Sequence, residues 1–201
     1  MRKCGLTLLE LLVVVAVMVA LAAIVVPLLG SSQNDASMAA TRTTMLALRD
    51  AIFGTDRASG FVEDVGDYPA KAHLAGWPGG WPEKIHDLLS NEHLPAPKQT
   101  FDIHTHRGWN GPYLRSADGV YTVDTAHGFT SDYCYNSGAD LAIIDAWNHP
   151  IVIQYITATV NPGDATVRLV SAGPDGVLNT LPSDASAAGD DIVVPLKRAG
   201  L

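Results

Sequence analysis

Three aspartates near the C-terminus form the pattern with the clearest chemistry. Asp175 lies in the sequence Val-Ser-Ala-Gly-Pro-Asp-Gly-Val, and Asp190 and Asp191 follow in Gly-Asp-Asp-Ile. Ca²⁺ takes about six to eight oxygen ligands in a flexible loop, and three acids gathered without a cation would repel one another. The alternative is a β-turn over residues 173–176, because Pro at its second position and Gly at its fourth suit such a turn. The aspartates would then be solvated.

Histidines raise the question of a transition-metal site. Asp102, His104 and His106 alternate along the chain, which predicts that all three lie on one side of a strand. A zinc site needs a third or fourth ligand and supporting hydrogen bonds, and the motif supplies neither. An exposed polar strand face is therefore the favoured interpretation.

Cys134 is the candidate nucleophile, since it could meet His127 or His149 together with an aspartate. A lone cysteine is more often a small buried apolar residue, and no nucleophile motif surrounds this one. The chain also lacks a phosphate-binding loop of the G-x-x-x-x-G-K-[ST] type. We therefore predict that the protein is not an enzyme.

Composition narrows the class of protein further. Of 201 residues, 47% are hydrophobic and 17% charged, which excludes a disordered, highly charged chain. Thirteen Lys and Arg against 21 Asp and Glu leave a net charge of -8. Nucleic-acid binding needs a basic face, so no nucleic-acid partner is expected. Two cysteines rule out a disulfide scaffold and a four-thiolate metal site.

The N-terminal region holds the longest apolar stretch, at residues 6–29. As a helix this segment would be roughly 36 Å long, enough to cross about 30 Å of hydrocarbon. Arg2 and Lys3 precede it, which predicts a cytoplasmic N-terminus and an exported remainder. An ordinary secretory signal cleaved at the A-x-A pattern of residues 20–22 is the competing interpretation. Glu10 would interrupt its apolar region, and the apolar stretch continues past the cut.

The segment Lys3-Cys4-Gly5-Leu6-Thr7-Leu8-Leu9-Glu10-Leu11 resembles the prepilin signature of type IV pilins and type II secretion pseudopilins. The resemblance implies cleavage between Gly5 and Leu6 by a prepilin peptidase, with methylation of the new Leu6 amine. Glu10 would then pair with that amine on a neighbouring subunit and set the register of a filament. Leu6 departs from the family, where Phe is commoner.

An amphipathic helix is predicted beyond the apolar segment. Met38, Met45 and Ile52 recur every seven residues with Leu48 between them, which indicates one apolar face on a helix that ends near Phe53. Strand-like runs follow at residues 120–123, 141–144, 151–157 and 165–170. The predicted fold class is α+β, pilin-like, with a long N-terminal helix, half in the membrane and half amphipathic, packed on a small antiparallel sheet.

Further segments extend the resemblance, among them residues 65–69, 109–114 and 145–150. The C-terminal aspartate pattern is similar to the calcium loop of the major pseudopilin of type II secretion. The resemblance implies one bound Ca²⁺. Its ligands would be oxygen atoms of Val170, Ser171, Asp175, Val177, Asp190 and Asp191. Whether Asp190 or Asp191 closes the site stays open.

Four parts are expected: a leader at 1–5, a transmembrane or filament-core helix at 6–29, its amphipathic continuation at 30–56 and a periplasmic domain at 57–201. The resemblance implies a single-pass inner-membrane subunit of a type II secretion pseudopilus. It would polymerise with itself and other pilin-like subunits into a periplasmic filament for protein export. A prepilin peptidase and an inner-membrane secretion platform would be its other partners. A minor type IV pilin or a membrane-anchored periplasmic binding module are the alternatives.

Overall fold

The computed structural model describes residues 8–65, 84–157 and 167–196, and within residues 24–32 it describes the backbone only. The chain divides into two compact units, Met1–Ser37 and Met38–Leu201. A continuous helix, α1 (Leu8–Phe53, 46 residues), contributes to both units.

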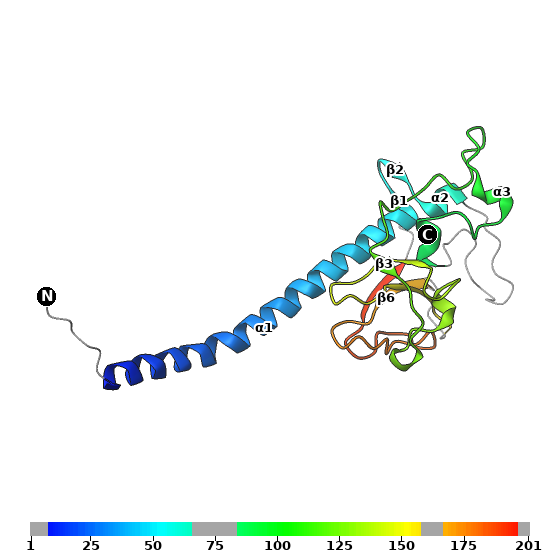
Figure 1. The fold of residues 1–201 in the computed structure, drawn as a ribbon. Coiled ribbons are helices and arrows are strands. Elements are labelled where there is room, and N and C mark those ends of the chain that lie inside the picture. Colours follow the sequence, from blue (N-terminus) through cyan, green and yellow to red (C-terminus); the bar gives the residue numbers. More distant parts are fainter. Residues whose placement is uncertain (1–7, 66–83, 158–166, 197–201) are drawn as a thin grey trace. The chain divides into compact units, whose positions relative to one another are not determined.

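The first unit consists of the N-terminal part of α1 (Figure 1). Leu, Val and Ala dominate residues 8–23, and Glu10 in the first turn suits the positive end of the helix dipole. Every side chain between residues 8 and 23 is exposed, with Leu8 at 83% and Met18 at 67%. Residues 8–23 therefore present an apolar surface that Glu10 alone interrupts with a charge.

The predicted membrane span is wrong by this structure. Within the described residues, no helix combines the length and the hydropathy that a membrane crossing requires. The predicted single-pass inner-membrane location, with a cytoplasmic N-terminus and a periplasmic C-terminal domain, is corrected by the same finding.

Beyond α1 the elements are short. In chain order they are β1 (Gly54–Thr55), β2 (Ala58–Ser59), α2 (Phe61–Val65), the 3-10 helix η1 (Ile85–Leu88), α3 (Ala96–Gln99), β3 (Gly119–Val120), the 3-10 helices η2 (Thr125–His127) and η3 (Ser131–Tyr133), β4 (Leu141–Ala142), β5 (Val152–Tyr155), β6 (Val167–Ser171) and β7 (Ile192–Leu196). Most of the 65–69 segment lies outside the described residues, as do the first two residues of the run predicted at 165–170.

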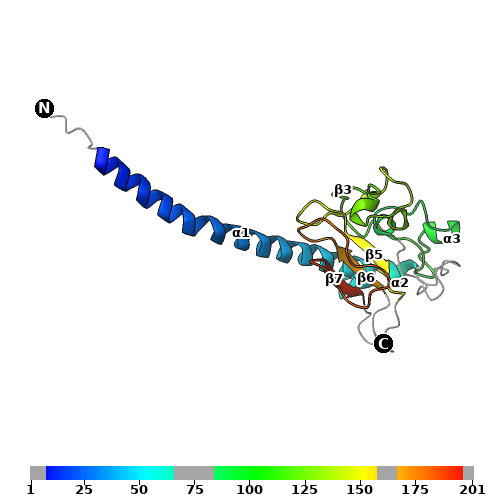
Figure 2. The same ribbon diagram turned by 90° about the horizontal axis from the view of Figure 1, so that it is seen from below.

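The described strands form three separate antiparallel sheets, so the prediction of one small sheet is wrong. Two of the sheets are two-stranded, β1-β2 and β3-β4, and the third has the order β5-β6-β7. Figure 2 shows these last three strands side by side. In the register, Val170 pairs with Val152 on one side and with Val193 on the other. Pro195 lies in β7, at the end of this sheet order.

Both faces of the β5-β6-β7 sheet are buried. Ile153 and Leu169 belong to one core cluster, whereas their neighbours Val152 and Val170 belong to a second. Successive side chains of a strand point to opposite faces, so the two clusters lie on the two sides of the sheet. A sheet covered on both sides explains the nearly continuous apolar runs in these strands.

The last part of α1 supplies one of the two covers. Met45, Leu48 and Ile52 are at most 1% exposed, belong to the same cluster as Ile153 and Leu169, and have Met38 packed against them. The apolar face predicted from their spacing is confirmed. The helix ends at Phe53, before Gly54, which adopts a positive φ of 85° that a residue with a side chain rarely adopts.

A buried arginine ties a loop to the second face of the sheet. Arg168 is 2% exposed, and its guanidinium donates to the carbonyl oxygens of Leu181 (2.7 Å) and Asp184 (2.9 Å) and to the side-chain oxygen of Gln154 (3.1 Å). Burying a charge is costly unless it is hydrogen-bonded. These bonds fix residues 181–184 beside β6, within the long connection between Asp175 and Asp190.

We expect Leu48→Ala to lower the free energy of unfolding by about 2–5 kcal/mol, because it removes buried methyl groups and leaves a cavity. Leu46→Ala is the matched control, since Leu46 lies two residues away on α1 and is 41% exposed. Its effect should stay within about 0.5 kcal/mol. Chemical denaturation of both full-length variants measures the difference, and equal losses would contradict the assigned packing.

Candidate functional site

The predicted processing site lies outside the described residues, which begin at Leu8, so Gly5 and Leu6 are not placed. Glu10 is placed in the first turn of α1, with its side chain exposed. It is the one charged residue in the sequence between residues 8 and 23. The N-terminal candidate is thus a single carboxylate on an otherwise apolar helix surface.

The C-terminal loop brings Asp175 and Asp190 together. The backbone N–H of Asp175 donates to Oδ2 of Asp190 at 3.1 Å, and Val177 donates its N–H to Oδ1 of Asp175 at 2.7 Å. Asn179 donates its side-chain amide to Oδ2 of Asp175 (3.4 Å) and to the carbonyl oxygen of Val177 (3.1 Å). The loop therefore holds two exposed carboxylates and a carbonyl oxygen around one short turn.

Gly173 allows this close approach. Its φ is +68°, and a Cβ there would lie 2.5 Å from the carbonyl oxygen of Asp190 and 3.2 Å from Oδ2 of the same residue. No side chain fits at that separation. The contact between the 173–176 turn and Asp190 thus requires a glycine at this position.

Asp191 points to a different partner. It is 8% exposed, and its Oδ2 accepts the backbone N–H of Thr180, while its Oδ1 is buried without a hydrogen-bond partner. Burial raises the pKa of the Asp191 carboxyl, and the nearby Asp190 raises it further. Of the two acids that the sequence left open, Asp190 is the one that contacts the Asp175 turn.

The two remaining predicted ligands lie at the end of β6 and are engaged elsewhere. Ser171 is fully buried and donates its hydroxyl to Oδ2 of Asp145 at 2.6 Å. Val170 is paired on both sides within the sheet, and a residue in a central antiparallel strand directs its carbonyl toward one of its neighbouring strands. The Ser171 hydroxyl is therefore engaged by Asp145, and Val170 by the sheet.

Asp145 is the site residue that sequence reasoning missed. Its Oδ1 accepts the backbone N–H groups of Trp147 and His149, each at 2.9 Å, and its Oδ2 accepts the hydroxyl of Ser171. Three hydrogen bonds stabilise a carboxylate whose side chain is fully buried. Its position ahead of the 145–150 turn, where an aspartate caps the following N–H groups, was the available signal.

A hollow of about 410 Å³ adjoins this turn. It is lined by Asp124, His127, His149 and Asp175 among others, and Asp124 pairs with His127 at 2.7 Å. Gly176 borders it, and a Cβ there would lie 2.7 Å from Nε2 of His149. The hollow offers carboxylates and imidazoles, which suit a polar ligand or cation.

Cys134, the candidate nucleophile, lies apart in the second core cluster. It is 7% exposed and donates its thiol to the carbonyl oxygen of Ser131 at 3.8 Å. Burial raises the pKa of this thiol, with Asp140 adding to the shift. The environment keeps the sulfur protonated and weakly nucleophilic.

The predicted strand at residues 102–106 is wrong. A bridge between Asp102 and Arg107 closes a tight turn, in which Asp102 accepts the N–H of His104 at 2.8 Å and His106 adopts a φ of 52°. All three predicted polar residues are exposed. The alternation therefore reflects a turn with side chains in solvent.

Comparison of the chain with protein-family models, with curated proteins and with solved structures finds no match. The resemblance to pilins and pseudopilins therefore rests on the sequence motifs alone.

We expect the stability of the Asp191→Asn variant to improve relative to wild type as the pH rises. Burial raises the pKa of Asp191 above its ordinary value of 3.8, so the folded state holds this proton to higher pH than the unfolded chain does. The stability that the protonated Asp191 carboxyl contributes is fully present below the pKa of this group in the unfolded chain. It is lost as the pH rises through the pKa of the group in the folded protein. Asparagine does not ionise in this range.

Urea unfolding of both full-length proteins between about pH 3 and pH 7 measures the trend. Asp56→Asn, which removes an exposed carboxylate near the β1-β2 turn, is the control. The expectation is contradicted if the stability difference from wild type changes with pH equally in Asp56→Asn, or does not change in Asp191→Asn. Either result would show that burial of Asp191 does not cause the pH dependence.

Proposed function

We propose that the chain is a structural subunit of a pilin-like filament of the type II secretion pseudopilus kind, which serves protein export. It assembles with copies of itself and with other pilin-like subunits after a prepilin peptidase cuts between Gly5 and Leu6. The secretion platform that builds the filament is its further partner. The exposed apolar surface of α1 is the observation that carries this proposal.

That surface is contiguous, unlike the single apolar residues that are scattered over most protein exteriors. All described side chains from residue 8 to residue 23 are exposed, and Glu10 alone among them is charged. Contiguous exposed apolar surface marks an interaction site, and a helix that is apolar on all sides is one that becomes surrounded. Equivalent helices of other subunits offer a matching apolar surface, so a helical bundle buries it.

Glu10 gives such a bundle its register. A carboxylate surrounded by apolar helices is stabilised only when a cation lies beside it. The amine that cleavage creates on Leu6 is the cation that the prepilin resemblance supplies. Pairing between Glu10 of one subunit and Leu6 of the next then selects one axial stagger, because other staggers leave the charge in an apolar environment.

The second unit suits a subunit whose exposed part must stay fixed to its helix. Met45, Leu48 and Ile52 of α1 are core residues of that unit, and Thr41 of the same helix accepts the N–H of Ala146 at 3.1 Å while fully buried. The helix is thereby built into the unit's core. Assembly through α1 would carry the whole unit into the filament.

We further propose that the C-terminal loop binds Ca²⁺ with Asp175 and Asp190. Both carboxylates are exposed, Asp190 contacts the turn that carries Asp175, and Asn179 bridges Asp175 and the carbonyl oxygen of Val177. A hard cation accepts this oxygen set together with water. Binding would join the 173–176 turn to the residues just before β7. The two ends of the connection between Asp175 and Asp190 would then be held by the ion, and its middle by Arg168.

Glu10→Ala is expected to abolish filament assembly, because the bundle loses the charge pair that fixes its stagger. Electron microscopy of filaments from cells expressing the protein with its secretion machinery provides the measurement. Glu63→Ala, which removes an exposed carboxylate from α2, is the matched control and should assemble normally.

Intact-mass measurement should show wild type and Glu10→Ala both beginning at Leu6, which separates assembly from processing. Normal filaments from Glu10→Ala would contradict the register role. A wild-type protein that still begins at Met1, or begins after residue 22, would overturn the filament proposal itself.

Calcium should raise the melting temperature of the chelator-treated full-length chain. At a concentration 100 times Kd the stabilisation is about 2.7 kcal/mol, or roughly 5–10 °C for a chain of this size. Asp190→Asn should lose most of the shift, whereas Asp56→Asn should keep it. A wild-type melting temperature that millimolar calcium leaves unchanged would refute the calcium site.

A further inference from the structure

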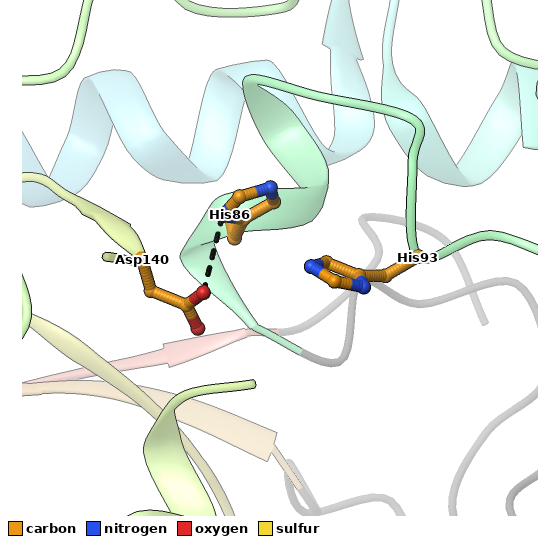
Figure 3. Close-up of side chains that lie close together, drawn as sticks. All are labelled: His86, His93 and Asp140. Atoms are coloured by element: carbon orange, nitrogen blue, oxygen red, sulfur yellow. Dashed lines mark ion pairs between the residues drawn. The ribbon is translucent and has the colours of Figure 1, made fainter. Parts of the chain in front are cut away.

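A second group of metal-ligating side chains lies away from the C-terminal loop. Within the described residues, one ligand atom from each of His86, His93 and Asp140 falls within 4.8 Å of the other two. Figure 3 shows the three side chains converging from η1, from the segment after it and from the residue before β4. Their separation in sequence conceals this grouping, which depends on the fold.

His86 is held in place by the core. Its side chain is 5% exposed, and its Nδ1 lies 3.6 Å from Oδ1 of Asp140, the contact drawn in Figure 3. This distance is too long for a hydrogen bond. It is close to the roughly 3.4 Å that separates two ligand atoms of a tetrahedral zinc ion when each lies about 2.05 Å from the metal. The same Nδ1 accepts a long, weak 3.4 Å contact from the N–H of Leu141, which a cation would displace.

The second ring nitrogen of His86, Nε2, faces a carboxylate. It lies 2.8 Å from Oε1 of Glu92, yet this buried nitrogen makes no hydrogen bond in its present orientation. A metal-ligating histidine usually donates its other ring N–H to a carboxylate, which fixes the tautomer. Glu92 is placed to accept that proton, which leaves the lone pair on Nδ1 for a metal.

His93 and Asp140 are positioned through one aromatic residue. The ring of His93 packs on Tyr135 with 4.0 Å between centroids and an interplanar angle of 32°. Asp140 is 3% exposed, and its Oδ2 accepts the backbone N–H of Tyr135, so Oδ1 is turned to His86. The side chain of His93 is 34% exposed, which gives the group access to solvent.

The charges around the group favour a cation. Asp140 and Glu92 contribute negative charge at its two sides, and the phenol of Tyr135 donates to Asp87 at 3.0 Å. The ammonium of Lys84 lies 5.3 Å from the Tyr135 ring centroid and donates to the carbonyl oxygen of Asp132. A divalent ion would reduce the excess of acidic groups.

We propose that His86, His93 and Asp140 bind one divalent transition-metal ion of the Zn²⁺ type. Two imidazole nitrogens and one carboxylate oxygen suit zinc and its neighbours, whereas Ca²⁺ prefers oxygen ligands alone. A water molecule takes the fourth position. The ion fastens η1 and the His93 segment to the start of β4. This site is independent of the proposed filament function and of the calcium loop.

Zinc titration of the metal-stripped full-length chain tests the site, with a chromophoric chelator as competitor. Wild type should bind one Zn²⁺ per chain at this site, and Co²⁺ in its place should give the visible absorption of a low-coordinate nitrogen and oxygen site. His93→Gln should weaken binding on the order of 100-fold or more, because it removes a direct ligand. Since His93 is partly exposed, this variant should keep the wild-type circular dichroism spectrum.

His104→Gln is the matched control, since it changes an exposed histidine in the 102–107 turn and should bind Zn²⁺ as wild type does. Asp190→Asn should also retain zinc binding, which separates this site from the calcium loop. Absence of stoichiometric zinc binding, wild-type affinity in folded His93→Gln, or an equal loss in His104→Gln would each overturn the proposal. Asp140→Asn, which keeps the shape of the carboxylate, should reproduce the loss seen with His93→Gln.

Discussion

The last part of α1 packs Met45, Leu48 and Ile52 into the core on one face of the β5-β6-β7 sheet, while the second core cluster fills the opposite face. Because both faces are buried, any polar side chain on these strands must find partners inside the protein. Arg168 meets this requirement through carbonyl groups of the connection that leads to β7. Burial of the sheet thus fixes residues 181–184 beside β6.

Two aspartates near the C-terminal end of β6 have different surroundings and different roles. Asp145 is buried and fully hydrogen-bonded, so it fixes the turn before β5 to Ser171. Asp190 is exposed and meets the Asp175 turn through a backbone N–H. A buried carboxylate with three donors is structural in character, whereas exposed carboxylates grouped on a turn keep oxygen atoms available to a cation.

Local patterns in the sequence predict the parts of this fold that local forces determine. The spacing of Met45, Leu48 and Ile52 predicts a buried helix face, and the β-branched runs predict β5 and β6. The predicted membrane span is wrong, since no helix within the described residues has the length and hydropathy of a membrane crossing. Contacts that depend on topology, such as that between His86 and Asp140, leave no periodic signal.

The proline in β7 has a consequence for how copies of this chain meet. Pro195 pairs with Arg168 on the inner side, and it has no N–H to offer on the outer side. A strand at the margin of a sheet otherwise provides a template on which another chain can extend the hydrogen-bonded ladder. The missing donor therefore discourages the addition of a strand from another chain at this edge.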